Sequence, residues 1–135
     1  MNTYRAQILT PDGPVFEGEV VSLRLPGTNG NFQVLYNHAS LMSNLEIGET
    51  VVQKENGEIE LYAISGGFVD VNDNTLILLA EAAERADEIN ITRAQAAKER
   101  AEERLKANHI DQARADLALQ RAVNRLKVAR QASRG

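Results

Sequence analysis

The stretch SGGFVDV, residues 65–71, divides this sequence, because it holds the last aromatic ring and the last glycines before the final residue. All nine proline, tyrosine and phenylalanine residues and eight of the nine glycines lie at or before Phe68. Residues 69–134 contain none of them. Glycine and proline mark turns, whereas a long stretch without either permits helix. We therefore expect two units: a turn-rich module of strands over residues 1–86 and a helical unit over residues 87–135.

Short runs of alternating hydrophobic residues recur about every ten residues in the first unit, and turn signals close them. Two of these turn signals lie in the second half of the unit. Asn56-Gly57 predicts a type I′ hairpin, and Asn72-Asp73-Asn74 predicts a second hairpin turn. About eight to ten short strands in a unit of this size are typical of a flattened β-sandwich or barrel.

Four polar residues in this region match the spacing of a calcium-binding loop. The first, third, fifth and twelfth positions of that template hold Asp70, Asn72, Asn74 and Glu81. The sixth position, however, holds Thr75 where the template needs glycine, and the flanking sequence has the pattern of strands rather than helices. A hairpin turn explains the cluster without a metal, so we predict no metal site.

No set of residues has the sequence pattern of a catalytic centre. Cysteine is absent, which excludes disulfides and thiolate metal sites. The sequence has no glycine-rich phosphate loop followed by Lys and Ser or Thr, and no nucleophile with a base and an orienting group. His38, without a neighbouring histidine, is interpreted as a loop residue that bonds to backbone. We predict a protein that is not an enzyme and requires no cofactor.

The N-terminal residues lack the apolar core of a signal peptide. No apolar run approaches the ~20 residues that span a bilayer. We expect a soluble protein that reaches a membrane only through a partner.

The net charge of −4 is divided unevenly along the chain. Residues 1–84 carry three basic and twelve acidic side chains, a net charge of −9, whereas residues 85–135 carry twelve basic and seven acidic ones, a net charge of +5. After residue 111 the only acidic residue is Asp116. It is outnumbered by Arg114, Arg121, Arg125, Lys127, Arg130 and Arg134. This asymmetry indicates an electrostatic partner for the tail, either nucleic acid or an acidic protein surface.

The helical unit has the pattern of two helices joined by a short loop. Thr92 and Gln95 fit a capping box, which predicts a helix start between Asn90 and Thr92. Residues 108–111 interrupt the pattern, and Asp111 is a suitable N-cap for the second helix. The residues that recur at three- and four-residue spacing are Ala94, Ala97, Ala101 and Leu105, then Ala115, Leu119, Ala122, Leu126 and Ala129. They predict an antiparallel hairpin.

Alanine pairs along this seam allow a close approach of the helices but bury little area, at roughly 25 cal/mol per Å². Two hypotheses follow. The hairpin is either a stable element docked on the sandwich or a marginal one that comes apart, so that each helix packs elsewhere.

Several stretches match one known family in the same order along nearly the whole chain. They are residues 10–13, 25–32, 38–39, 45–48, 65–71, 80–84 and 118–126. The Ser-Gly-Gly-Phe block, found in this order with the other stretches, is specific for one family. The chain resembles the epsilon subunit family of bacterial-type rotary F-type ATP synthases. It departs from that family at Gln33 and Asn37, where glycine is usual, and at Ser40, where proline is usual.

The resemblance implies a non-catalytic subunit of the central rotor stalk, at the cytoplasmic face of the cell membrane. It would couple proton flow to ATP synthesis and restrain ATP hydrolysis through mobile C-terminal helices. The sandwich would bind the gamma subunit and rest on the ring of c subunits. The residues implied to approach the ring are Gly27, Thr28, Asn29, Gly30 and Asn31, with His38 nearby. The basic second helix would meet the alpha and beta subunits, and there Arg114, Arg121 and Arg125 share one flank.

In some bacterial members of the family, ATP binds the folded hairpin through a motif Ile/Leu-Asp-x-x-Arg-Ala. Residues 89–94 of this chain read Ile-Asn-Ile-Thr-Arg-Ala, so Asn90 replaces the aspartate. The other residues at matching positions are Glu84, Arg93, Arg121 and Arg125. Asn90 can cap the helix but cannot form a charged pair with an arginine. We therefore expect weak regulatory binding of ATP, or none.

An adaptor whose basic helix binds nucleic acid is the alternative hypothesis. It would explain the charge division. Against it, the tail has no aromatic ring for base stacking, and the acidic first unit would repel phosphate.

Overall fold

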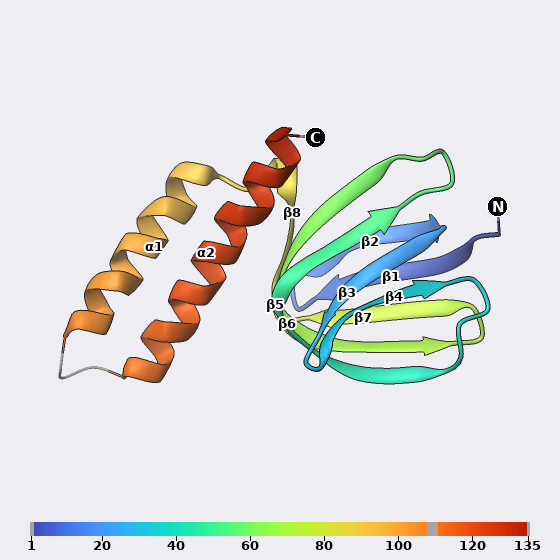
Figure 1. Ribbon diagram of the computed structural model, residues 1–135, viewed down its shortest axis with the longest axis horizontal. Coiled ribbons are helices and arrows are strands. Elements are labelled where there is room, and N and C mark those ends of the chain that lie inside the picture. The colour runs from blue at the N-terminus through green and yellow to red at the C-terminus, as the bar shows by residue number, and fades with distance from the viewer. Residues whose placement is uncertain (1, 108–110, 135) are drawn as a thin grey trace. The chain divides into compact units, whose positions relative to one another are not determined.

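The computed structural model describes residues 2–107 and 111–134 and divides the chain into two compact units, Met1–Arg85 and Ala86–Gly135. Figure 1 shows strands in the first unit and helices in the second. The strands are β1 (Tyr4–Thr10), β2 (Gly13–Val20), β3 (Ser22–Gly27), β4 (Gly30–Leu35), β5 (Leu41–Gln53), β6 (Ile59–Asn72), β7 (Thr75–Ala80) and β8 (Ala83–Arg85). The helices are the 3-10 helix η1 (Ala86–Glu88), α1 (Ile91–Lys106) and α2 (Gln112–Arg134).

The eight strands form one sheet in the order β2-β1-β7-β6-β5-β3-β4, and β8 also pairs with β6. β1 and β7 run parallel, and the other pairs are antiparallel. Figure 1 shows the sheet curving over on itself, so that it forms the two layers of a sandwich. The sheet is not closed. The predicted β-sandwich is therefore confirmed, and the alternative of a barrel is wrong.

The two central strands are longer than the short strands that the sequence predicted. β6 runs through residues 59–72 without a break and so joins two runs that the glycines at 66 and 67 separate in the sequence. Both glycines have a positive φ, 87° at Gly66 and 155° at Gly67. A Cβ atom at Gly67 would lie against the backbone of Leu79 and Ala80. The glycines therefore let the strand bend and pack closely within one continuous strand.

The two hairpin turns differ from each other in a way that the sequence did not predict. At 56–57 only Gly57 has a positive φ, of 87°, and its N–H donates to the Lys54 carbonyl at 3.0 Å. The predicted type I′ turn at Asn56-Gly57 is therefore wrong, because that turn needs a positive φ at both central residues. The predicted turn between β6 and β7 is confirmed, and there Asp73 (φ 49°) and Asn74 (φ 55°) both have the left-handed conformation.

The core of the sandwich consists of large aliphatic side chains from both layers. The largest side chains with no more than 1% exposure are Tyr62, Ile8, Leu23, Leu25, Ile64, Leu76, Leu78, Val20, Val34, Val52 and Val69. The Tyr4 hydroxyl, also buried, donates to the Val34 carbonyl at 2.7 Å and so links β1 to β4. The predicted alternation in β1 is confirmed, since Tyr4, Ala6 and Ile8 all point into this core.

The helices form the predicted hairpin with one predicted cap replaced. The Asn90 side chain accepts from the Arg93 N–H at 3.0 Å, so Asn90 is the N-cap of α1. The predicted capping box of Thr92 and Gln95 is therefore wrong, and Gln95 instead donates to Glu99. Asp111 caps α2 as predicted, by accepting from the Arg114 N–H at 3.1 Å. The predicted interruption at residues 108–110 lies outside the described residues.

The seam between α1 and α2 is built mainly of alanine, as the spacing predicted. The buried seam residues are Ala94, Ala101, Ala115, Ala122, Leu126 and Ala129. Ala97, Leu105 and Leu119 are half-buried. Val128 is also buried, at a position outside the predicted seam.

Candidate interaction sites

One outward face of the sandwich is apolar across several neighbouring strands. Leu79 pairs with Leu9 of β1 on one side and with Phe68 of β6 on the other. Ile77 and Met42 both pair with Asp70, in the next row of the same face. Paired residues on neighbouring strands share a face. We call Leu9, Met42, Phe68, Ile77 and Leu79 the outer apolar face; Met42 is 67% and Leu79 52% exposed.

The outer apolar face was not among the sites predicted from the sequence, although β7 carries a signal for it. Residues 76–79 read Leu-Ile-Leu-Leu, so both faces of the strand are apolar. A strand that contacts the core on one face and water on the other normally alternates with polar residues. Leu76 and Leu78 are fully buried, which leaves Ile77 and Leu79 on the outer side. Although Asp70 lies between Met42 and Ile77, exposed hydrophobic side chains gathered on one face in this way indicate an interaction site.

The turn between β3 and β4 presents a short polar tip. Thr28, Asn29, Gly30 and Asn31 are exposed, whereas Gly27 is buried. The Thr28 N–H donates to the Asn44 carbonyl at 3.4 Å, which links the turn to β5. Four of the five predicted ring-facing residues are therefore available to a partner.

His38 lies at the other end of β4 from this turn, in the loop that leads to β5. Figure 1 shows the turn and the loop at opposite ends of the strand. The expectation that His38 lies near residues 27–31 is therefore not met. His38 is half-buried, and its Nδ1 lies 2.7 Å from the Ala39 carbonyl, as expected for a loop residue that bonds to backbone.

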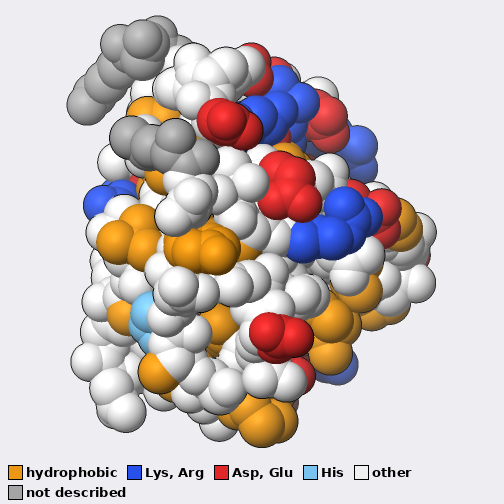
Figure 2. Space-filling model, turned by 90° about the vertical axis from the view of Figure 1, so that its right-hand side faces the viewer, with side chains coloured by type: hydrophobic (Ala, Val, Ile, Leu, Met, Phe, Trp, Pro, Cys, Tyr) orange, Lys and Arg blue, Asp and Glu red, His pale blue; other side chains and the backbone are white. Residues whose placement is uncertain are grey.

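The loop with His38 is tied to the β6–β7 turn by side-chain hydrogen bonds. The Asn37 N–H donates to the Asn74 side chain at 2.7 Å, and the Asn74 amide donates back to the Asn37 side chain at 3.0 Å. Ser40 donates to the Asn72 side chain at 3.0 Å. Asn37 itself has a φ of 63°, which explains why the resembled family has glycine at this position. Figure 2 faces this end of the sandwich and shows acidic and basic side chains gathered on one side of it.

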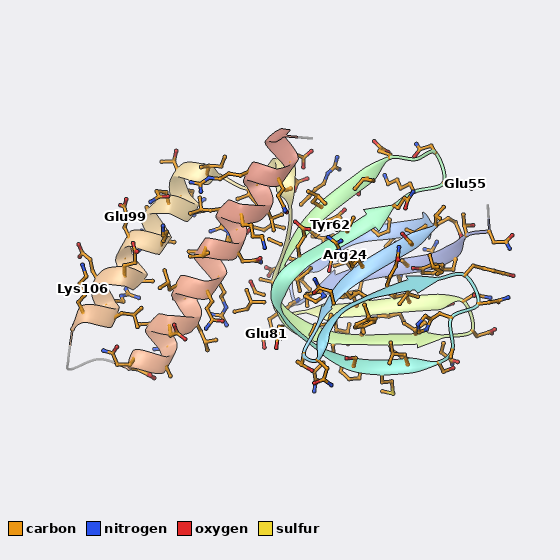
Figure 3. The ribbon with its side chains drawn as sticks, viewed as in Figure 1. Arg24, Glu55, Tyr62, Glu81, Glu99 and Lys106 are labelled. Carbon is orange, nitrogen blue, oxygen red and sulfur yellow. The ribbon has the colours of Figure 1, made fainter. Side chains whose placement is uncertain are left out.

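These hydrogen bonds also account for the residues that matched the calcium template. Asn72 and Asn74 bind the neighbouring loop. Glu81 follows β7, and Figure 3 shows it far from the turn that begins that strand. Among the described residues, no group of three or more His, Asp or Glu side chains is arranged to hold a metal ion.

The predicted basic flank of α2 divides into exposed and half-buried parts. Arg114 is exposed, whereas Arg121 and Arg125 are half-buried. On helical geometry of about 100° per residue, the three side chains lie within about 60° of one another. The flank therefore presents one fully accessible guanidinium and two that are partly covered.

The residues that correspond to the nucleotide motif belong to both units. Glu84 lies in β8 and is half-buried. In the second unit, Asn90 and Arg93 are exposed at the start of α1. Figure 1 shows this end of α1 beside the C-terminal half of α2, which carries Arg125, whereas Arg121 lies near the middle of α2. The side-chain carbonyl oxygen of Asn90 is already used in capping α1.

A cationic hollow of about 310 Å³ lies between α1 and α2, and the sequence analysis did not predict it. Its lining is Lys98, Val123, Leu126, Lys127, Arg130 and Gln131. Lys98 comes from the helix with the more acidic sequence, so only the packing of the two helices reveals that it joins the basic residues of α2.

A buried carboxylate network lies at the edge of the sandwich where β8 pairs with β6. Glu60 is 7% exposed, its Oε2 lies 2.6 Å from Lys54 Nζ and 3.9 Å from Arg85 Nη1, and its Oε1 accepts from the Tyr62 hydroxyl at 2.8 Å. Burial raises the pKa of Glu60, but the hydrogen bonds from Lys54 and Tyr62 outweigh it and leave the pKa below its ordinary value. The hydrogen bond with Glu60 raises the pKa of Lys54.

The two units match two domains of one protein family. Residues 3–86 match the β-sandwich domain of the ATP synthase delta/epsilon chain, and residues 87–130 match its long α-helix domain. The ATP synthase epsilon chain of Anoxybacillus flavithermus is 47% identical over 107 residues, 79% of each chain. That of Pelotomaculum thermopropionicum is 50% identical over 103 residues, 76% of each chain. These comparisons do not support a nucleic-acid adaptor.

The fold also resembles a chain in a solved structure. A chain in the cryo-EM structure of the Euglena gracilis mitochondrial ATP synthase (OSCP/F1/c-ring) superimposes with a TM-score of 0.77, over 98% of this chain and 82% of that one, at 23% identity. No helix within the described ranges 2–107 and 111–134 is long and apolar enough to cross a membrane. On the agreement of both family domains and of these relatives, the chain belongs to the ATP synthase delta/epsilon family.

Proposed function

We propose that the chain is the non-catalytic epsilon subunit of a proton-translocating F-type ATP synthase. In the central rotor stalk it couples proton flow to ATP synthesis, and its C-terminal helices restrain ATP hydrolysis. The observation that carries this proposal is the division of the chain into an acidic sandwich with its own core and a basic hairpin with an alanine seam. One unit is suited to permanent docking, and the other is suited to changing its contacts.

The sandwich docks on the gamma subunit through the outer apolar face. Leu79 and Met42 are more than half exposed on it, and Leu9, Phe68 and Ile77 surround them on neighbouring strands. Burial of such side chains against a partner supplies the main favourable term in stable association. The rigid β-sheet beneath the face holds these side chains in place before the partner arrives, which lowers the entropic cost of docking.

The exposed tip at residues 28–31 meets the ring of c subunits. Its residues are small and polar, and the link from Thr28 to Asn44 holds the turn against β5. A polar tip of this kind suits a contact with the polar loops of a membrane ring. Through this contact the subunit lies at the cytoplasmic face of the cell membrane.

The basic flank of α2 meets acidic loops of the alpha and beta subunits. Exposed ion pairs steer and position a partner more than they add affinity. The hairpin must open or swing for this contact, and its seam favours such a movement, because most of the buried residues there are alanines. The basic flank thus provides a restraint that can be released.

Truncation tests whether the sandwich alone supports assembly and ATP synthesis while the hairpin restrains hydrolysis. A chain that ends after Asp87 is to be incorporated into the ATP synthase in place of the full chain. We expect recovery of the alpha, beta and gamma subunits in a pull-down from cell membranes and continued ATP synthesis, together with faster ATP hydrolysis. Loss of the complex on truncation would contradict the proposal, and so would unchanged hydrolysis.

A further inference from the structure

The last strand of the sandwich is short and ends at the boundary between the two units. β8 has three residues, and it pairs with β6 at Tyr62↔Arg85, Ala63↔Glu84 and Ile64↔Ala83. The second unit begins at the next residue, Ala86. A strand of this length contributes few ladder hydrogen bonds, and the residue that it packs against the hydrophobic core is the small, half-buried Ala83. Apolar burial alone therefore holds β8 weakly.

The carboxylate of Glu60 supplies an additional anchor at this strand. One of its oxygens faces both Lys54 of the β5–β6 turn and Arg85, the last residue of β8. Its other oxygen accepts from Tyr62, which is the β6 residue paired with Arg85. Figure 3 shows Tyr62 in the sheet. Both carboxylate oxygens of Glu60 have partners, and the side chain is only 7% exposed. Glu60 therefore links the β5–β6 turn, β6 and β8.

We propose that Glu60 is a latch that keeps β8 in the sandwich, so that movement of the helical unit pivots at the Arg85–Ala86 bond. Without the latch, opening would extend into β8 and release Glu84 and Arg85 from the sheet. Glu60 is thus a positioning residue for the pivot. The proposal rests on the proposed function only in assuming that the helical unit moves.

Local exchange of backbone amides tests the latch in the isolated full-length chain. Hydrogen–deuterium exchange is to be followed in peptides that cover residues 81–86, in wild type and in Glu60→Gln. We expect exchange in this segment to become about threefold faster, because the Glu60–Arg85 ion pair spans 3.9 Å and the Arg85 side chain is partly exposed. Peptides from β1 and β7 serve as the internal reference for intact folding and are expected to keep their rates.

Glu58→Gln is the matched control. Glu58 also pairs with Lys54, at 3.5 Å, but its side chain is 55% exposed, whereas that of Glu60 is 7% exposed. We expect this variant to exchange like wild type in residues 81–86. If Glu60→Gln fails to fold, Tyr62→Phe removes one of the hydrogen bonds to Glu60 while the carboxylate stays, and a smaller acceleration in the same segment is expected.

Wild-type exchange rates at residues 81–86 in Glu60→Gln, with the sandwich folded, would overturn the latch. An equal acceleration in Glu58→Gln would overturn it as well, because the effect would then come from Lys54 alone. The measurement needs no partner subunit. The truncation experiment can therefore contradict the proposed function without affecting the exchange result. Failure of the proposed function and failure of the latch are thus distinguishable.

Discussion

The sandwich and the hairpin are built from different core residues. The sandwich buries leucine, isoleucine, valine and tyrosine side chains from both layers of a sheet, whereas five of the six buried residues of the hairpin seam are alanine. Burial of a large aliphatic side chain contributes about 1.5–3 kcal/mol to stability, and burial of an alanine contributes far less. The stabilising energy is therefore concentrated in the sandwich. The difference separates a unit that must stay folded from a unit that must be able to rearrange.

The largest expected effect comes from truncating a large side chain in the sandwich core. Leu78 is fully buried in β7, and Leu78→Ala should lower the free energy of unfolding of the sandwich by about 3 kcal/mol, since it leaves a cavity. Leu126→Ala removes the same atoms from the hairpin seam and should lower the helix content with little effect on the sandwich. Urea unfolding, followed by tyrosine fluorescence for the sandwich and by circular dichroism for the helices, measures both. Equal effects of both variants on the tyrosine transition would show one cooperative unit.

The sequence predicted the two units well because composition alone distinguishes them. It failed where several residues compete for one local role. Asn56-Gly57 is the usual signal of a type I′ turn, yet Asp73 and Asn74 have that conformation, and the Asn74 side chain bonds to Asn37 across the loop. Thr92 is a good cap, but Asn90 lies two residues earlier and caps α1 first. At the first site a hydrogen bond between distant segments is involved, which local sequence does not contain; at the second, two suitable caps compete within one segment.

Asn90 offers a test of whether the hairpin is a nucleotide sensor. Its carbonyl oxygen caps α1, so its remaining polar group is an amide donor that cannot pair with an arginine guanidinium. We expect no ATP binding to the isolated wild-type chain in the low-micromolar range, and a gain in affinity of about tenfold in Asn90→Asp, from a restored charge-assisted bond. Calorimetry measures both.

Asn90→Ser is the matched control for this substitution. Serine is also a good N-cap but carries no charge, so we expect this variant to bind ATP no better than wild type. A low-micromolar dissociation constant for the unaltered chain would reject the prediction and make the hairpin an ATP sensor.

The pH dependence of the sandwich should reflect Glu60. Its folded pKa lies below the ordinary glutamate value of about 4.3, so its ionised form stabilises the fold above that pH and the contribution is lost as the pH falls through the folded pKa. Glu60→Gln should therefore be less stable than wild type by about 1 kcal/mol at pH 7, a modest value because Lys54 is partly exposed to water. As the pH falls below about 4.3 and through the folded pKa, the difference between the two proteins should shrink. Urea unfolding at several pH values measures the difference, and a difference that does not shrink at acid pH would exclude Glu60 as its source.

The sequence points to candidate sites only where one segment forms them. The turn at 28–31 is such a contiguous segment, and four of its residues are exposed. The outer apolar face draws on β1, β5, β6 and β7, and the cationic hollow draws on both helices. Register and helix packing assemble these surfaces. For the same reason the expected proximity of His38 to the turn failed, since it depended on the direction of β4.

The smallest expected effect concerns the basic flank of α2 in the assembled complex. Replacing Arg114, Arg121 and Arg125 by glutamine removes three positive charges from one side of the helix. Because exposed ion pairs contribute a few tenths of a kcal/mol each, we expect ATP hydrolysis to rise by only about threefold and to become less sensitive to salt. The matched control replaces Lys98, Lys127 and Arg130, which line the cationic hollow on another part of the hairpin. It removes the same number of positive charges. If the restraint depends on the flank, the control variant hydrolyses ATP at the wild-type rate. If the restraint depends only on net charge, the hydrolysis rate rises equally in both variants. That result would contradict the assignment of the restraint to these three arginines.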